Sequence, residues 1–238
     1  MPVDRTAFLL LCLPAESGPE VSLGRRVFAE GIGSLLLSAT VIGSGIMAER
    51  LAAGNAAVAL LANTGATVAV LAVLIAMLGP VSGAHFNPVV SLVQSLRGEL
   101  GMSPTLAYIA IQVLGCVAGA LLAHAMFELP LLQTSMHVRT GPAQWLSEGV
   151  ATAGLIVVIL GASSFAAASW RVPAWIGAAY WFTASTSFAN PAITIGRSLS
   201  DSFAGISPQD VPMFVVSQLA GGLMGLFVAK VLFAGRTT

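Results

Sequence analysis

Charged residues are scarce in this sequence. Asp, Glu, Lys and Arg make up 8% of its 238 residues, against roughly 25% in an ordinary soluble domain. Hydrophobic residues make up 56%, and the mean hydropathy is +0.89. The formal net charge is zero, and no basic patch with interleaved aromatic residues occurs, so nucleic acid is not an expected partner. The composition indicates a protein that contacts the lipid bilayer.

The residue clusters that support catalysis or metal binding are also missing. Cys12 and Cys116 are isolated, so their spacing predicts neither a disulfide framework nor a metal site. His124 and His137 have no Ser, Asp or Cys arranged around them, and no phosphate-binding loop occurs. We therefore expect no enzyme activity, no cofactor and no bound metal.

Long stretches without charge dominate the chain. No Asp, Glu, Lys or Arg occurs in residues 51–96, 100–127, 149–170, 172–196 or 211–229. A helix needs about 20 apolar residues to cross a bilayer. The pattern predicts six full spans, at about 27–48, 56–78, 105–126, 144–168, 173 to just before 190, and 211–233. Gly79-Pro80 is expected to end the second span and Pro173 to begin the fifth.

Two further apolar stretches are too short to cross. One follows Asn87-Pro88 and ends near Leu96, and the other runs from Asn190-Pro191 to about Leu199. Each is about half a crossing long, so we expect two re-entrant half-helices. Six full and two half spans place both termini on one side of the membrane. Seven of the ten Lys and Arg residues lie on that side, so the positive-inside rule predicts cytoplasmic termini. We expect the protein in the inner (plasma) membrane of the cell.

Three landmarks occur twice and in the same order. They are Glu30 and Glu148, Asn87-Pro88 and Asn190-Pro191, and Gln112 and Gln218. The repeats cover about 25–128 and 143–236, with three full spans each. An odd number of spans makes the repeats inverted across the membrane, and such symmetry places the functional site near the midplane, where broken helices meet.

With these doubled motifs, residues 25–236 resemble the aquaporins, the major intrinsic protein family. The resemblance implies an all-α membrane protein, a bundle of six transmembrane helices plus two re-entrant half-helices that meet head to head. It also implies a homotetramer with one pore per subunit. Residues 1–24 contain three prolines and only a short apolar run, so we expect them to be a disordered cytoplasmic tail, with residues 25–238 as the channel domain. The expected activity is passive transport of small uncharged solutes.

The doubled Asn-Pro motif has a physical use in such a pore. Asn caps a helix well, and Pro at the first helical position loses no needed hydrogen bond. Two helix N-termini facing each other carry about half a positive charge each and repel cations. The amides of Asn87 and Asn190 can then donate to a passing solute at a dry constriction.

Buried carboxylates are costly within a membrane, so Glu30 and Glu148 need a role. One alternative is a proton relay or cation site, which a proton-coupled secondary transporter would use. In the family that the chain resembles, the glutamate instead supports the backbone of the re-entrant loops, and Gln112 and Gln218 are grouped with it. His85 is either a structural residue or, by the family pattern Gly-Ala-His-x-Asn-Pro, part of the pore lining.

The family's narrow outer filter is changed in this chain. Gapless family offsets assign the filter to Thr67, Ala178, Ser187 and Ile193, and most aquaporins carry Arg where Ile193 stands. Four small, uncharged and non-aromatic side chains predict a wide filter. Losing a cation about 7 Å away removes roughly 2 kcal/mol of repulsion at an effective dielectric near 20.

Arg197 follows Ile193 by one helical turn. It either supplies charge at the outer vestibule or forms an ion pair with Asp201, one turn further on. The run from Ile193 to Gly205 also resembles bacterial aquaglyceroporins associated with arsenic resistance. The predicted solutes are therefore glycerol-like polyols, trivalent metalloid hydroxides such as arsenite, and water. A water-selective aquaporin, a proton-coupled transporter and a membrane scaffold with a closed pore remain the alternatives.

Overall fold

The structure, a computed structural model, describes residues 21–234. These residues form eight α-helices and no strand, which confirms the predicted all-α fold class. Most of the predicted N-terminal tail lies outside the described residues, as do residues 235–238. The first helix of the described residues begins at Leu23, so Leu23 and Gly24 belong to the helical bundle instead of the tail.

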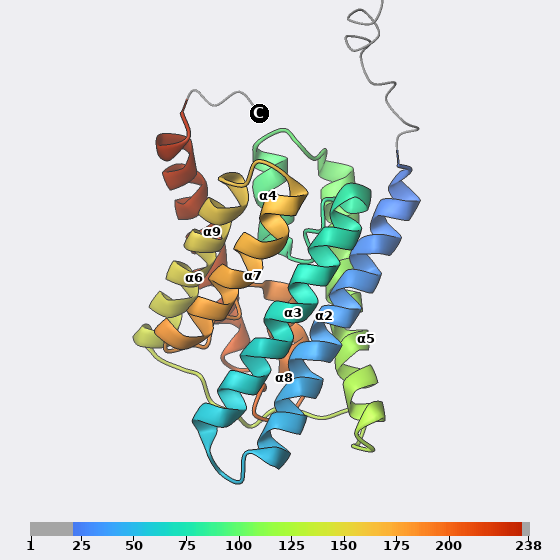
Figure 1. Cartoon of the computed structure of the whole chain (residues 1–238), viewed down its shortest axis with the longest axis vertical. Helices are drawn as coiled ribbons and strands as arrows, with labels where there is room; N and C mark the ends of the chain where they lie inside the picture. Colours follow the sequence, from blue (N-terminus) through green and yellow to red (C-terminus); the bar gives the residue numbers. More distant parts are fainter. Residues whose placement is uncertain (1–20, 235–238) are drawn as a thin grey trace, which may run out of the picture.

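Six long helices form the bundle (Figure 1). They are α2 Leu23–Leu51, α3 Ala56–Ser82, α5 Met102–Met126, α6 Pro142–Leu160, α7 Phe165–Phe182 and α9 Val211–Leu232. All but α7 are long and apolar enough, by length and composition, to cross a membrane. The 18 residues of α7 span about 27 Å at 1.5 Å per residue, close to the hydrocarbon thickness of about 30 Å.

Two short helices lie inside the bundle. They are α4 Pro88–Leu96, with nine residues, and α8 Pro191–Ser198, with eight. Figure 1 shows them in opposite halves of the bundle, and it shows α2 beginning at the end where α9 finishes. This arrangement is the inverted repeat predicted from the doubled motifs.

The boundary between the fourth and fifth spans differs from the prediction. In the structure α6 ends at Leu160 and α7 begins at Phe165. Pro173 therefore lies inside α7 instead of at its start. The Ser164 hydroxyl caps α7 by accepting a hydrogen bond from the Ala167 amide at 3.1 Å. Likewise Pro80 lies inside α3, which continues to Ser82. Proline is tolerated in membrane helices because neighbouring groups satisfy the freed backbone, so it is a poor end marker here.

Close helix packing repeats between the two halves. In the first, Gly115 of α5 lies against the Gly31 carbonyl of α2; in the second, Gly221 of α9 lies against the Gly149 carbonyl of α6. A Cβ at either α5 or α9 glycine would clash with that carbonyl. Small residues are the usual means of close helix contact within membranes, and here they set the same crossing in each repeat.

Candidate pore

The two re-entrant loops share an unusual backbone. Each has left-handed residues at three matching positions, with φ between 47° and 92°: Gly83, Ala84 and Phe86 in the first loop, and Thr186, Ser187 and Ala189 in the second. Such conformations cost about 1–3 kcal/mol each for residues other than glycine. The surrounding structure must therefore hold both loops in place.

The Glu30 carboxylate holds the first loop. It accepts hydrogen bonds from the amides of His85 at 2.9 Å and Phe86 at 2.7 Å, from the Ser82 hydroxyl at 2.7 Å and from the Gln112 side chain at 2.8 Å. Glu30 has no exposed surface. The carboxylate thus satisfies backbone amides that would otherwise be unpaired in an apolar region.

Glu148 does the same for the second loop. Its carboxylate accepts from the amides of Phe188 at 2.9 Å and Ala189 at 2.8 Å, and from the Gln218 side chain at 2.7 Å. Gln218 also donates to the Thr194 hydroxyl at 2.9 Å, as Gln112 donates to Ser91 at 3.0 Å. Both glutamates are engaged by donors of their own repeat, an arrangement suited to supporting the loops.

The Asn-Pro motifs meet at the centre of the molecule. Asn87 caps α4 by accepting from the Val89 amide at 2.9 Å, and Asn190 caps α8 by accepting from the Ala192 amide at 3.0 Å. The side-chain amides also cross between the loops: Asn87 Nδ2 donates to the Ala189 carbonyl at 2.7 Å, and Asn190 Nδ2 donates to the Phe86 carbonyl at 2.8 Å. An amide nitrogen has two hydrogens, so each Asn keeps one for another acceptor.

A cavity of about 470 Å³ passes this meeting point. Most of its wall is apolar, formed by residues such as Leu37, Ile75, Leu155 and Ile176. Polar side chains interrupt this wall at a few places, among them Thr67, His85, Asn87, Ser187, Asn190 and Arg197. An apolar wall with a few placed donors is the usual form of a selective pore.

The structure changes one member of the predicted filter. Thr67, Ser187 and Ile193 line the cavity, but Ala178 is exposed on another face of α7 and does not line it. Tyr180 does, with 3% of its surface exposed and its hydroxyl 3.3 Å from that of Thr67. The assignment of Ala178 is therefore wrong, since two residues along a helix turn a side chain by roughly 200°.

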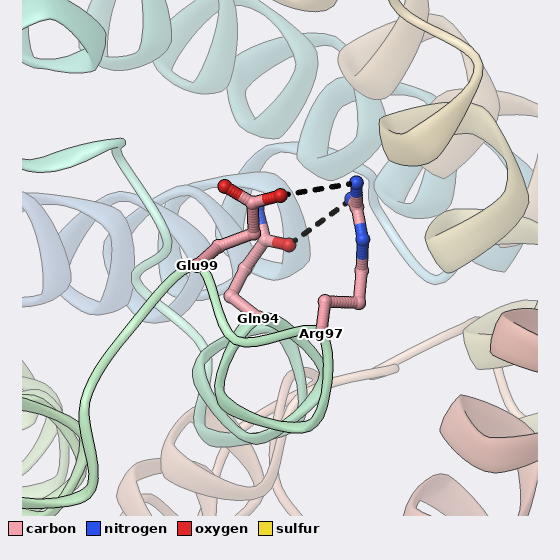
Figure 2. A network of polar contacts seen from close by, with 3 residues as sticks. All are labelled: Gln94, Arg97 and Glu99. Carbon is pink, nitrogen blue, oxygen red and sulfur yellow. Dashed lines mark hydrogen bonds and ion pairs between the residues drawn. The ribbon is translucent and has the colours of Figure 1, made fainter. Parts of the chain in front are cut away.

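His85 lies at the end of the cavity near α4, which we call the α4 mouth together with Gln94 and Arg97. Its Nδ1 is 3.1 Å from the Ser91 hydroxyl, and its ring packs edge-on against Tyr108. Arg97 donates to the Gln94 side-chain oxygen at 3.3 Å and forms a salt bridge with Glu99 at 3.5 Å, and Figure 2 shows the three side chains together. The cation at the α4 mouth is therefore paired with a carboxylate.

Arg197 lies at the opposite end, which we call the α8 mouth together with Phe188 and Ile193. It lines the cavity and has 2% of its surface exposed. Its Nε donates to the Ala204 carbonyl, and its guanidinium lies over the Phe188 ring, 3.3 Å from the centroid. Of the two alternatives for Arg197, the ion pair with Asp201 does not form among the described residues, and the Asp201 carboxylate instead accepts from the Met136 amide at 2.9 Å.

Arg139 is a second buried arginine near the α8 mouth. In the sequence it is only one of the three Lys and Arg residues that the topology does not place on the cytoplasmic side. Its guanidinium donates to the carbonyls of Gly205 at 2.8 Å, Ser185 at 3.3 Å and Phe203 at 3.3 Å. Burial lowers the pKa of Arg139 to about 10, so it is protonated at neutral pH. Its partners are backbone carbonyls, which leave no signal in a sequence.

Two opposed half-helices, a cavity between them and an inverted repeat together define a membrane channel. A family model described as Major intrinsic protein matches residues 19–180, more than half of the chain, so the chain belongs to this family. Its members are membrane channels and not enzymes.

Similar proteins support this membership. The chain is 54% identical over 213 residues to aquaglyceroporin AqpS of Rhizobium meliloti, covering 89% of this chain and 91% of that protein. It is 29% identical over 225 residues to aquaporin A of Dictyostelium discoideum, covering 88% and 78%. The crystal structure of the aquaglyceroporin from Plasmodium falciparum has the same fold, with a TM-score of 0.68 at 19% identity over 90% of this chain and 97% of that one.

Proposed function

We propose that this protein is a passive channel for water, glycerol-like polyols and trivalent metalloid hydroxides such as arsenite. It works as a homotetramer in the inner membrane, with both termini in the cytoplasm and the α8 mouth facing outward. One observation carries the proposal: the cavity passes two Asn side chains that each cap a half-helix and keep one amide hydrogen available.

The centre of the pore favours neutral hydroxylated solutes. A solute oxygen can accept from the remaining amide hydrogens of Asn87 and Asn190 and so replace part of its hydration. The N-termini of α4 and α8 present positive partial charge at the same place, which disfavours cations. The apolar walls offer few other partners, so a solute must carry its hydroxyl groups toward the two Asn residues.

The α8 mouth favours a solute larger than water. Ile193 stands where most aquaporins carry an arginine. The Ser187 hydroxyl is buried without a hydrogen-bond partner among residues 21–234. Tyr180 makes this mouth smaller than the all-small filter expected from the sequence. The name of the relative from Rhizobium meliloti supports polyols, and metalloid hydroxides follow because they resemble glycerol in shape and are uncharged.

The proton-coupled alternative finds less support. Glu30 and Glu148 each accept at least three hydrogen bonds from the loops and the glutamines. A carboxylate that releases and binds a proton in each transport cycle would break and remake these bonds, and so disturb the strained loops.

Flux through purified protein in liposomes tests the proposal. Stopped-flow light scattering would measure water and glycerol permeability, and arsenite entry would be measured in the same preparation. We expect all three to exceed empty liposomes, with no saturation and no dependence on a proton gradient. Accumulation against a gradient would establish a coupled transporter, and flux at the lipid background would establish a closed pore. Water flux without glycerol or arsenite flux would establish a water-selective aquaporin.

A further inference from the structure

The position of the Arg197 charge differs from the position of its backbone. Arg197 lies four residues after Ile193, roughly 6 Å further along α8. Helical side chains lean toward the helix N-terminus, and the Arg197 guanidinium lies over Phe188, two residues before Asn190. The side chain therefore carries its charge back along α8, toward the level of Ile193.

Among the described residues, no carboxylate lies within salt-bridge distance of this charge. Within residues 21–234, the only salt bridge joins Arg97 and Glu99 at the other mouth. A buried, unpaired cation is costly in a membrane and usually has a function. Its ring contact with Phe188 supplies part of the compensation, as cations over aromatic faces are attracted to them.

The guanidinium also has unused donor capacity. Arg197 Nη1 has no hydrogen-bond partner among the described residues, although the side chain lines the cavity. Arg139 is the useful contrast, because each of its three guanidinium nitrogens donates to a backbone carbonyl and it does not line the cavity. Arg139 supports the loops, whereas Arg197 is not accounted for by support alone.

We propose that Arg197 supplies the α8 mouth with the positive charge that Ile193 lacks, and that this charge excludes cations from the pore. The inference rests on the proposed channel function and names a residue that determines its selectivity. Because the Arg197 backbone lies one turn further along α8, the side chain at position 193 itself stays uncharged. The pore thereby keeps its room for polyols and still repels positive ions.

Ion leak through liposomes containing the full-length protein tests this proposal. The variants are Arg197→Gln, Arg197→Leu and Arg197→Lys, and Arg50→Gln is the matched control. Arg50 also donates to a backbone carbonyl, that of Phe127 at 3.3 Å, and stacks on the Phe127 ring, but it does not line the cavity. Water permeability of the same liposomes reports how much folded channel each preparation holds.

We expect potassium entry, measured with an enclosed fluorescent indicator, to rise on the order of tenfold in the Gln and Leu variants. The Lys variant and Arg50→Gln should match wild type. Combining Arg197→Gln with Ile193→Arg should restore exclusion, because it returns a guanidinium to the same level. The proposal would be overturned if the Arg197→Gln channel admitted no more potassium than wild type, or if the double variant still leaked potassium. Arg197 would then have a structural role.

The unmodified protein provides a readout that does not depend on the folding of any variant. Under a potassium chloride gradient, its residual leak should favour chloride over potassium, and a potassium-selective leak would overturn the proposal. Failure of the underlying channel function looks different, since wild-type liposomes would then show no water or glycerol flux above the lipid background.

Discussion

Residues 83–94 and 186–197 are two copies of one re-entrant element, and they differ in what their side chains present to the cavity. Both have three left-handed residues, a supporting glutamate and an Asn cap. At matching places, however, Gln94 of the α4 mouth is neutral, while Arg197 of the α8 mouth is charged and unpaired. The loop backbone is thus the same in both copies, but the charge of the side chain at the two mouths differs.

The duplicated backbone has a physical reason. A loop buried in a membrane must satisfy its amides within the protein, and a carboxylate from the first helix of each repeat meets that need in both copies. The mouths are under no such constraint, since any side chain that fits the cavity is compatible with the same backbone. Changes to the support should therefore have larger effects than changes to the mouths.

Replacing a supporting glutamate should have the largest effect. Glu148→Ala leaves the amides of Phe188 and Ala189 without an acceptor, and each such loss costs about 1–3 kcal/mol. We expect a lower unfolding temperature and little folded channel, measured by thermal unfolding and size-exclusion chromatography in detergent. Glu30→Ala is the matched test at the other loop. If Glu148→Ala were stable and transported solutes normally, the support role of the carboxylate would be wrong.

Restoring an arginine at the α8 mouth should strongly reduce the passage of large solutes. Ile193→Arg adds a bulky charged group beside Ser187 and Tyr180, and we expect glycerol and arsenite uptake to fall far more than water flux. Val90→Leu, at the matching place of α4, enlarges a side chain without adding charge and serves as the comparison. Equal falls in water and glycerol flux after Ile193→Arg would contradict the position of the filter.

Widening the filter should have a smaller effect of opposite sign. Tyr180→Ala removes the aromatic ring whose hydroxyl is 3.3 Å from that of Thr67, so uptake of a polyol larger than glycerol should rise several-fold by stopped-flow. Losing a buried aromatic side chain costs about 3–5 kcal/mol of stability, so the protein must be studied at low temperature. Ala178→Leu is the control and should change nothing. An effect of Ala178→Leu with none of Tyr180→Ala would return the filter to Ala178.

Breaking the ion pair at the α4 mouth should have the smallest effect. The Arg97 and Glu99 side chains are 25% and 54% exposed, and exposed pairs contribute about 0.2–1 kcal/mol. Glu99→Gln should therefore shift the unfolding temperature slightly and leave potassium exclusion unchanged. A large potassium leak in Glu99→Gln would mean that the two mouths share control of ion exclusion.

Much of the fold could be predicted from the sequence because its signals are local. Span lengths follow from apolar runs, and the half-helices follow from Asn-Pro pairs that begin stretches too short to cross. The boundary near Ser164 is not predicted correctly, because a proline such as Pro173 suggests the start of a span although a membrane helix tolerates an internal proline.

Parts of the candidate pore were beyond sequence reasoning. Tyr180 and Ala178 are two positions apart in the chain, so only the rotation of α7 and the length of the loop after it decide which one faces the cavity. Arg139 was missed because it binds backbone carbonyls. The choice between two roles for Arg197 was left open, since its contacts depend on where residues 201–204 return to the bundle.

Composition and local motifs are enough to predict a membrane protein with a doubled, inverted architecture and two capped half-helices. Those features depend on composition, on chain length and on hydrogen bonds within a few residues. The tertiary structure decided which side chains line the cavity and where the charge of Arg197 lies. These depend on helix rotation and on contacts between residues far apart in the chain, which packing of the whole bundle sets.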